Sequence, residues 1–248
     1  MASQQSQSAA EAQQEAVEPL AILAHELRNP IGAIRNAVSV MESAGKLPGA
    51  MDQARRLIAR QVGQLSVLVE DLLDLASFSR GTLVLRRNWI DVVKEVEAAV
   101  EACSWSLGAS GHALCVEVPN GPLHAYVDGP RLRQVITNLL DNACKYTRHH
   151  GRIRLTLELA DGCAVVSVED NGTGIASDRL PFVFDLFTRS CELRENPSRG
   201  LGVGLALVRE IVELHGGCVE ARSNGLDRGS AFVVRLPVLD PMMFVHEI

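Results

Sequence analysis

The sequence of 248 residues has few aromatic residues, few lysines and no closely spaced cysteines. Phe, Trp and Tyr make up 4% of the chain, so the core must be built from aliphatic side chains. The net charge is −6, which excludes the overall electrostatic character of a nucleic-acid-binding protein. No two of the six cysteines lie closer than 12 residues apart, so a zinc-type C-x-x-C pair is absent from the sequence. We therefore expect reduced and mostly buried cysteines, as in a cytosolic protein.

Long apolar runs are also missing. No stretch approaches the roughly 18 apolar residues of a membrane span, and the N-terminus lacks the basic and apolar regions of a signal peptide. With 47% hydrophobic and 22% charged residues, the composition is that of a soluble globular protein. The length suits one large domain or two ordinary ones. We expect no contact of this segment with a membrane.

The N-terminal third has the spacing of two amphipathic helices. Residues 1–14 are rich in Ser, Gln, Ala and Glu, which indicates a tail or a linker from an upstream segment. Apolar residues then recur every three or four positions from Val17 to Met41 and again from Leu57 to Phe78. Gly45–Gly49 interrupts the pattern, so residues 15–82 should form an antiparallel helical hairpin.

The apolar stripe of this hairpin is too wide for the hairpin to bury by itself. A homodimer, in which two hairpins form a four-helix bundle, would bury it. The alternative is that the hairpin docks on the rest of the same chain.

From residue 88 to 238 the pattern is that of a mixed α/β domain. Expected helices run over Asp91–Leu107, 128–146, Asp178–Phe187 and Val203–His215, and expected strands over Ala113–Val118, Leu123–Val127, Arg152–Leu159, Ala164–Glu169, Cys218–Ser223 and Ser230–Leu236. The fold class is therefore α+β: a hairpin followed by an α/β sandwich, a mixed sheet with helices on one face. Arg189–Arg199 should be a loop and 239–248 a C-terminal tail.

The first segment that could carry chemistry is His25-Glu26-Leu-Arg-Asn29-Pro. His25 lies off the apolar stripe of its helix. The neighbouring Glu26 carboxylate can accept one ring N–H, which leaves the other ring nitrogen available as a nucleophile. Taken alone, the segment slightly favours a solvated surface histidine with an incidental helix kink over a nucleophile.

Three further segments, each compatible by itself with a polar helix face or an ordinary turn, together favour a nucleotide with phosphates and a metal ion. Asn138, Asn142 and Lys145 share one helix face, where two amides and an ammonium could hold a hydrated divalent cation and phosphate oxygens. Asp170-Asn-Gly172-Thr-Gly174 follows an apolar strand, so its carboxylate could accept from an exocyclic amine. Gly200-Leu-Gly202-Val-Gly204-Leu205 leads into a helix, where free N–H groups and the helix dipole attract anions.

Together these segments resemble a bacterial sensor histidine kinase of the HisKA class with a GHKL-type ATP-binding domain. HELRNP is similar to that family's H box, NLLDNACKYT to its N box, DNGTGI to its first glycine box and GLGVGLALVREIVELHGG to its second. Phe184-Asp-Leu-Phe187 resembles the F box, with Asp185 where the family more often has Glu, and Gly229 falls at a third glycine turn. The resemblance covers about residues 17–237.

The resemblance implies a role for each matching residue. His25 would be the phosphoacceptor, Glu26 its general base, and Asn29 the residue associated with phosphatase activity toward the partner. Asn138 and Asn142 would bind Mg²⁺ and phosphates, and Asp170 the adenine amine. The remaining ATP-binding positions would be Lys145, Tyr146, Gly172, Gly174, Arg189, Arg199, Gly200, Gly202, Gly204 and Leu205, with Arg194 as a further lid arginine.

The implied activity is ATP-dependent autophosphorylation of His25, phosphotransfer to an aspartate of a response-regulator receiver domain, and dephosphorylation of that partner. The implied cofactors are ATP and Mg²⁺. The implied partners are a receiver domain and a second copy of the chain. The implied location is the cytoplasm, or the cytoplasmic portion of a larger sensor. The ATP-binding domain would move about a linker near Arg86–Asn88. A GHKL ATPase without kinase activity and an inactive dimeric scaffold are the two other classes considered.

Overall fold

A computed structural model of the chain describes residues 27–41, 48–79, 83–186, 188 and 202–238. The chain divides into two compact units. The first comprises residues 1–79 and 189–203, and the second residues 80–188 and 204–248. The expected tails 1–14 and 239–248 and the expected loop Arg189–Arg199 lie outside the described residues.

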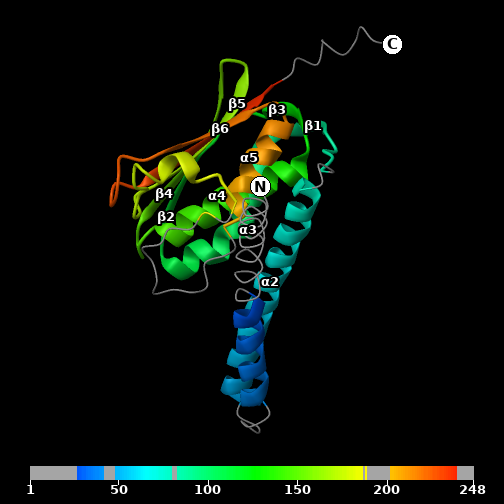
Figure 1. Ribbon diagram of the computed structural model, residues 1–248, viewed down its shortest axis with the longest axis vertical. Coiled ribbons are helices and arrows are strands. Elements are labelled where there is room, and N and C mark those ends of the chain that lie inside the picture. Colours follow the sequence, from blue (N-terminus) through cyan, green and yellow to red (C-terminus); the bar gives the residue numbers. More distant parts are fainter. Residues whose placement is uncertain (1–26, 42–47, 80–82, 187, 189–201, 239–248) are drawn as a thin grey trace, which may run out of the picture. The chain divides into compact units, whose positions relative to one another are not determined.

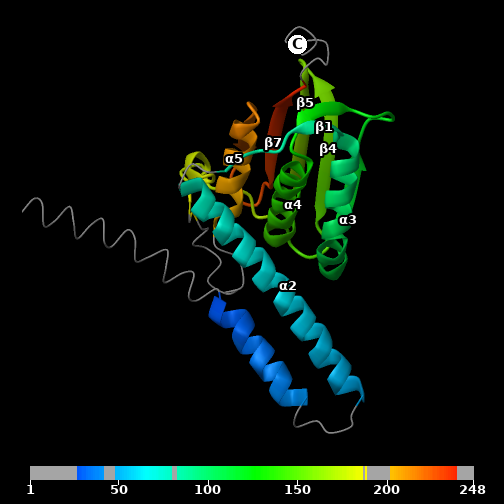
Figure 2. The same ribbon diagram turned by 90° about the vertical axis from the view of Figure 1, so that its right-hand side faces the viewer.

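The first unit contains the expected pair of helices. Residues 27–41 form one helix, and α2 spans Pro48–Ser79 with 32 residues. The two helices run side by side (Figure 2). The helix α2 begins earlier than the sequence pattern predicts, because Pro48 and Gly49 lie within it rather than in the turn. Proline is tolerated in the first turn of a helix, where its missing N–H has no intrahelical partner to lose.

The second unit is built on a mixed five-stranded sheet in the order β2-β4-β5-β7-β6. Its strands are β2 (Ala113–Glu117), β4 (Arg152–Ala160), β5 (Cys163–Asp170), β6 (Cys218–Arg222) and β7 (Ser230–Pro237). The strand β2 is parallel to β4, and the other neighbours are antiparallel. All five agree with the predicted strands to within two residues at either end.

Three helices cover one face of this sheet, as expected (Figures 1 and 2). They are α3 (Val92–Ser110), α4 (Gly129–Tyr146) and α5 (Gly204–Leu214). The side chains of Asp91 and Asp128 accept hydrogen bonds from the first turns of α3 and α4 and so cap both helices. Aliphatic side chains fill the layer between helices and sheet, among them Leu132, Ile136, Leu139, Leu140, Ile153, Leu155, Ile211 and Leu236. Each such side chain contributes about 1.5–3 kcal/mol when fully buried.

The structure corrects two expectations. The segment Asp178–Phe187 is not an α-helix: within its described residues the only helical element is the short 3₁₀ turn Leu180–Phe182. Pro181 lacks an N–H for a helical bond, and Phe184 is held in the core against Phe232, with ring centroids 6.2 Å apart. The second correction is the unexpected strand β1 (Asn88–Asp91), which pairs antiparallel with β3 (His124–Val127).

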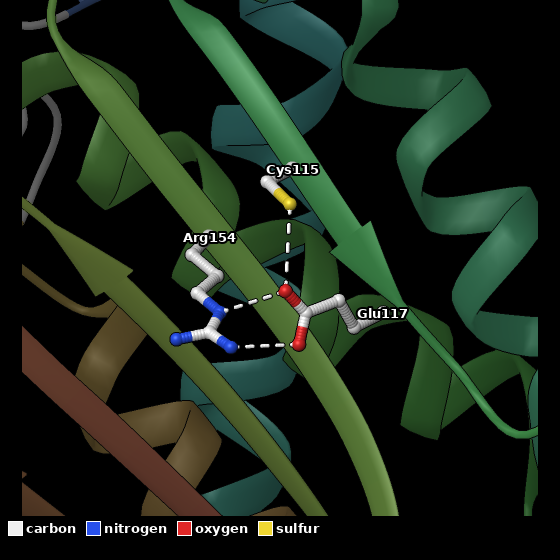
Figure 3. Close-up of polar contacts among 3 residues, drawn as sticks. All are labelled: Cys115, Glu117 and Arg154. Carbon is white, nitrogen blue, oxygen red and sulfur yellow. Dashed lines mark hydrogen bonds and ion pairs between the residues drawn. The ribbon is translucent and has the colours of Figure 1, made fainter.

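In the part of the chain that the structure describes, the cysteines are free but not mostly buried. Among the five cysteines in the described part, Cys103 is buried whereas Cys115 and Cys218 are exposed. Cys115 lies on the edge strand β2, on the face of the sheet away from the helices (Figure 3). Its thiol donates to Glu117, which forms a two-bond ion pair with Arg154 of β4 at 2.7 and 3.1 Å. Polar side chains thus surround the Cys115 thiol on this edge of the sheet, and the thiol faces solvent.

His215 connects the beginning of α4 to the end of α5 through hydrogen bonds. The residue is 5% exposed, and its ring makes two hydrogen bonds to backbone groups. Nε2 accepts from the Asp128 N–H at 2.9 Å, and Nδ1 faces the Ile211 carbonyl at 2.7 Å and must donate to it. These partners require the neutral ring with its proton on Nδ1. Burial, with a further effect of the Arg87 charge, lowers the pKa of His215, although the Ile211 bond and the Asp128 charge oppose the shift.

The lowered pKa makes the stability of the second unit depend on pH. In the unfolded chain His215 has a pKa of about 6.5, so below that value the unfolded state binds more protons than the folded state. The stabilising contribution of His215 is therefore complete above about pH 6.5 and is lost as pH falls through the lower folded pKa. We expect His215→Gln to cost about 1–3 kcal/mol at pH 7.5 and to lose less stability than the wild type on acidification.

Urea unfolding at pH 7.5 and 5.5 measures both effects. His124→Gln, which changes an exposed histidine of β3, is the matched control and should behave as the wild type. The same loss of stability on acidification in wild type and His215→Gln would contradict the assignment.

Candidate functional site

The first part of the candidate site is the polar face of α4. Buried aliphatic residues on the opposite face hold this helix against the sheet. Asn138 and Asn142 are half-buried and Lys145 is exposed, one turn apart along the helix. The Asn138 amide nitrogen donates to the carbonyl of Gly204, the first residue of α5, at 3.4 Å. The bond leaves the Asn138 amide oxygen as an acceptor beside the start of a second helix.

A carboxylate near this face has an unusual pKa. Burial raises the pKa of Asp141, and the positive charge of Lys145 one turn later partly opposes the shift. The thiol of Cys103 on α3 lies 4.0 Å from the Asp141 carboxylate. Burial raises the pKa of Cys103 to about 12 and that of Cys144 to about 11, so both thiols stay protonated and unreactive at neutral pH.

Asp170, the last residue of β5, is held in a single orientation. Its Oδ1 accepts from the Gly172 N–H at 2.7 Å, and its Oδ2 accepts from the hydroxyl of Ser230. Ser230 begins β7 and is the register partner of Asp170 across the sheet. Sequence reasoning missed Ser230, since only strand pairing brings residues 60 positions apart together. Two donors fix the carboxylate, and its remaining lone pairs can accept from a ligand.

The turn after Asp170 closes against the end of α4. The Tyr146 carbonyl accepts from the Thr173 N–H at 2.9 Å. A Cβ atom on Gly172 would lie 2.2 Å from that carbonyl oxygen, so no residue other than glycine fits without displacing the backbone. The amide-rich helix and the Asp170 turn are thereby held together.

The turn around Gly229 supports the turn that follows Asp170. Gly229 donates to the Gly172 carbonyl at 3.2 Å, has φ +70°, and leaves no room for a Cβ beside the Asp170 carbonyl oxygen. The Ser223 hydroxyl donates to the Gly229 carbonyl at 2.7 Å and accepts from the Ile175 N–H at 2.9 Å. Ser223 has no local sequence signal, because its hydroxyl joins two segments 48 residues apart.

The structure describes only some of the other predicted site residues. Gly204 and Leu205 lie in the first turn of α5, and Gly202 adopts φ +73°. Asn29 lies half-buried in the helix 27–41. The residues outside the described part are His25, Glu26, Arg189, Arg194, Arg199 and Gly200. The structure thus brings together Asn138 with Gly204, and Asp170 with Gly172 and the end of α4.

Two family models match the chain. The model of the His Kinase A phospho-acceptor domain matches residues 18–81, and the model of the histidine kinase-, DNA gyrase B- and HSP90-like ATPase matches residues 127–240. Asn138, Asp170 and the three glycine turns all fall within the second match.

The chain belongs to the histidine kinase family. It is 33% identical over 230 residues to the signal transduction histidine-protein kinase AfsQ2 of Streptomyces coelicolor, covering 88% of this chain and 41% of AfsQ2. The histidine kinase AdeS of Acinetobacter baumannii has a similar structure, with a TM-score of 0.63, 26% identity, and coverage of 87% of this chain and 98% of that one.

A second similar structure is full-length ShkA in complex with AMPPNP, with a TM-score of 0.63 and 28% identity. It covers 89% of this chain and 46% of ShkA. The chain spans less than half the length of AfsQ2 and ShkA, and corresponds to a catalytic core of the family. Among the described residues, no helix has the length and apolar character needed to cross a membrane.

Proposed function

We propose that this chain is the catalytic core of a two-component sensor histidine kinase. It would phosphorylate itself on His25 with ATP and pass the phosphoryl group to an aspartate of a response-regulator receiver domain. The observation that carries the proposal is the match of both family models on one chain, with HELRNP inside the first match and the Asp170 and Asn138 geometry inside the second. A GHKL ATPase without kinase activity would account for the second match alone.

In this proposal Asp170 recognises the adenine. Its carboxylate, already fixed by the Gly172 N–H and the Ser230 hydroxyl, accepts a hydrogen bond from the exocyclic amine. Gly172 and Gly174 let the backbone approach the base, and Tyr146 lies at the junction of the two segments. The AMPPNP bound to ShkA, an ATP analogue, supports a nucleotide at the equivalent domain.

The phosphates would lie along α4. Asn138 and Asn142 offer amide oxygens, the hard ligands that Mg²⁺ accepts beside waters and phosphate oxygens, and the orientation of Asn138 by Gly204 fits this use. Bound there, Mg²⁺ would neutralise phosphate charge. Lys145 would bind phosphate oxygens, and the start of α5 at Gly204 and Leu205 would supply N–H groups. Gly200, Gly202, Arg189, Arg194 and Arg199 would form the lid.

The nucleophile would come from the helical unit. A ring nitrogen of His25 forms a bond to the γ-phosphorus, the bond between that phosphorus and the β,γ-bridging oxygen breaks, and ADP leaves. Glu26 accepts a hydrogen bond from the N–H of the other ring nitrogen, which keeps the attacking lone pair available, and it takes that proton as the bond to phosphorus forms. A carboxylate oxygen of the receiver domain then takes the phosphoryl group and restores His25.

The helical unit would act as a homodimer. Its described helices expose apolar side chains on their surface, including Ile31 (55%), Met51 (39%) and Val69 (48%). A run of exposed apolar residues along two helices is typical of an interface. Two such hairpins would bury these residues in a four-helix bundle.

His25→Gln tests the nucleophile. We expect the variant to bind ATP and to lose autophosphorylation, because glutamine has no nucleophilic ring nitrogen. The measurement is acid-labile label from γ-labelled ATP, with the exposed His124→Gln as the matched control. Label remaining on His25→Gln would refute the assignment. ATP hydrolysis without label in the wild type would indicate an ATPase. If the wild type shows neither ATP hydrolysis nor label, the chain would be a scaffold.

Asp170→Asn tests the base contact. The amide cannot accept at both atoms, so we expect ATP to bind about tenfold to a hundredfold more weakly, equivalent to ~1.5–3 kcal/mol. Calorimetry measures the affinity. Asp161→Asn is the control, since Asp161 has φ +52° at an exposed turn and asparagine tolerates that conformation. Equal affinity of wild type and Asp170→Asn would mean that the base binds elsewhere.

Asn29→Ala tests the dephosphorylation of the partner. Asn29 comes four residues after His25, a spacing that would put both on one face of a continuous helix, where the Asn29 amide could orient a water toward the receiver's phospho-aspartate. We expect the variant to keep most autophosphorylation and to lose most dephosphorylation. Both rates are measured with the cognate regulator, beside Asn36→Ala, an exposed asparagine of the same helix. Loss of both rates, or of neither, would remove this role from Asn29.

A further inference from the structure

The last pair between β4 and β5 is closed by a side chain. The register pairs Asp170 with Ile153, so the next pair along the two strands is Asn171 with Arg152. In a hydrogen-bonded pair of an antiparallel ladder, the two residues exchange two backbone N–H···O bonds. Here the Asn171 N–H donates to the Arg152 carbonyl at 3.2 Å, but the Arg152 N–H donates at 2.7 Å to Oδ1 of the Asn171 side chain. The side chain thus replaces the backbone acceptor.

This replacement lets the backbone leave the sheet directly after Asp170. Because the Asn171 side chain satisfies the Arg152 N–H, the Asn171 carbonyl need not face β4, and the chain can turn. The turn follows at Gly172, which packs so closely on the Tyr146 carbonyl that a Cβ atom would not fit. Asn171 therefore joins the end of the strand pair to the turn beside α4.

The backbone at the start of β4 is held on two further sides. Gly151 donates its N–H to the Arg148 carbonyl at 2.9 Å and accepts from the Ala113 N–H of β2 at 2.9 Å. A Cβ atom on Gly151 would lie 2.9 Å from Oδ1 of Asn171, so the asparagine side chain packs closely on this backbone. Asn171 thereby attaches its turn to a part of β4 that other elements already fix in place.

The contacts around Asp170 act on it in two ways. The Gly172 N–H and the Ser230 hydroxyl donate to the two carboxylate oxygens and so orient the side chain. The Asn171 contacts instead fix the backbone that carries this side chain. Since Oδ1 of Asn171 is bonded to the Arg152 N–H, Asn171 acts on the carboxylate through the position of the backbone.

We propose that Asn171 is a positioning residue for adenine recognition. By closing the last pair of β4 and β5 with its side chain, it sets where the Asp170 carboxylate lies, and hence how well that carboxylate accepts from the exocyclic amine of the base. The inference rests on the proposed function, in which Asp170 binds adenine, and extends it to a second residue. A residue with this role affects the preference for a base that carries the amine more than the affinity for the rest of the nucleotide.

The test measures two affinities of the full chain by calorimetry: for ADP, and for purine riboside 5′-diphosphate, which lacks the exocyclic amine. We expect the wild type to bind ADP about tenfold to a hundredfold more tightly than the analogue, the range expected for the Asp170 contact. Asn171→Ala removes the acceptor of the Arg152 N–H. It should reduce this ratio about threefold to tenfold, with the affinity for the analogue within about twofold of the wild type.

Two variants serve as controls. Asn171→Asp keeps an acceptor oxygen for the Arg152 N–H and should retain the wild-type ratio, because its added charge acts on both nucleotides alike. Asn120→Ala changes an exposed asparagine between β2 and β3 and should match the wild type in both affinities. If thermal unfolding shows that Asn171→Ala does not fold, Asn171→Ser takes its place with the same expected ratio, since its oxygen lies one bond nearer the backbone.

An unchanged ratio in Asn171→Ala would overturn the proposal, whether both affinities stay at the wild-type values or fall together. If they fall together, Asn171 merely maintains the folded turn. A reduced ratio in Asn171→Asp would also overturn it, because that variant keeps the acceptor. Equal affinities of the wild type for the two nucleotides would instead refute the base contact of Asp170 in the proposed function, a result that does not involve Asn171.

Discussion

The hydrogen bond from the Asp128 N–H to His215 Nε2 is the constraint on which the ATP-binding unit depends. It joins the beginning of α4 to the end of α5 in a buried environment, where water cannot replace a lost partner. Asp128 also caps α4 and receives the Arg86 N–H, so one residue fixes two helices and the incoming chain. The bond requires a neutral histidine ring, which connects the architecture of the unit to pH.

Close backbone approach is the second constraint, at the opposite end of α4. The turn at Gly172 packs directly on the Tyr146 carbonyl, and Gly229 packs on the Asp170 carbonyl. These contacts leave no space for side chains, and they bring the end of a strand, the end of a helix and a third turn to one place. The Asp170 carboxylate is oriented by its neighbours before any ligand binds, which lowers the ordering cost of binding.

The sequence predicted much of this unit because its signals are local. Asp91 and Asp128 stand where helices begin, Asp161-Gly162 is a hairpin turn, and the alternation in β4 shows which of its residues face the helices. The wrong helix prediction and the missed strand β1 have a common cause. Phe184 alone is buried, against Phe232, in a segment that forms only a 3₁₀ turn, and β1 forms because β3 is available to pair with it. Neither effect leaves a periodic pattern in the chain.

By itself, the sequence determined the identity of the chemical groups and their order along the chain. The spacing of Asn138, Asn142 and Lys145 on one helix face follows from helical geometry alone. Only the tertiary structure decided that Ser230 and Ser223 support the Asp170 turn, that Arg87 binds the end of α5 and that His215 is neutral. These contacts join residues from 48 to 127 positions apart, except for the short one from Ser223 to Gly229. Their formation depends on sheet register and helix packing, which local residue patterns do not encode.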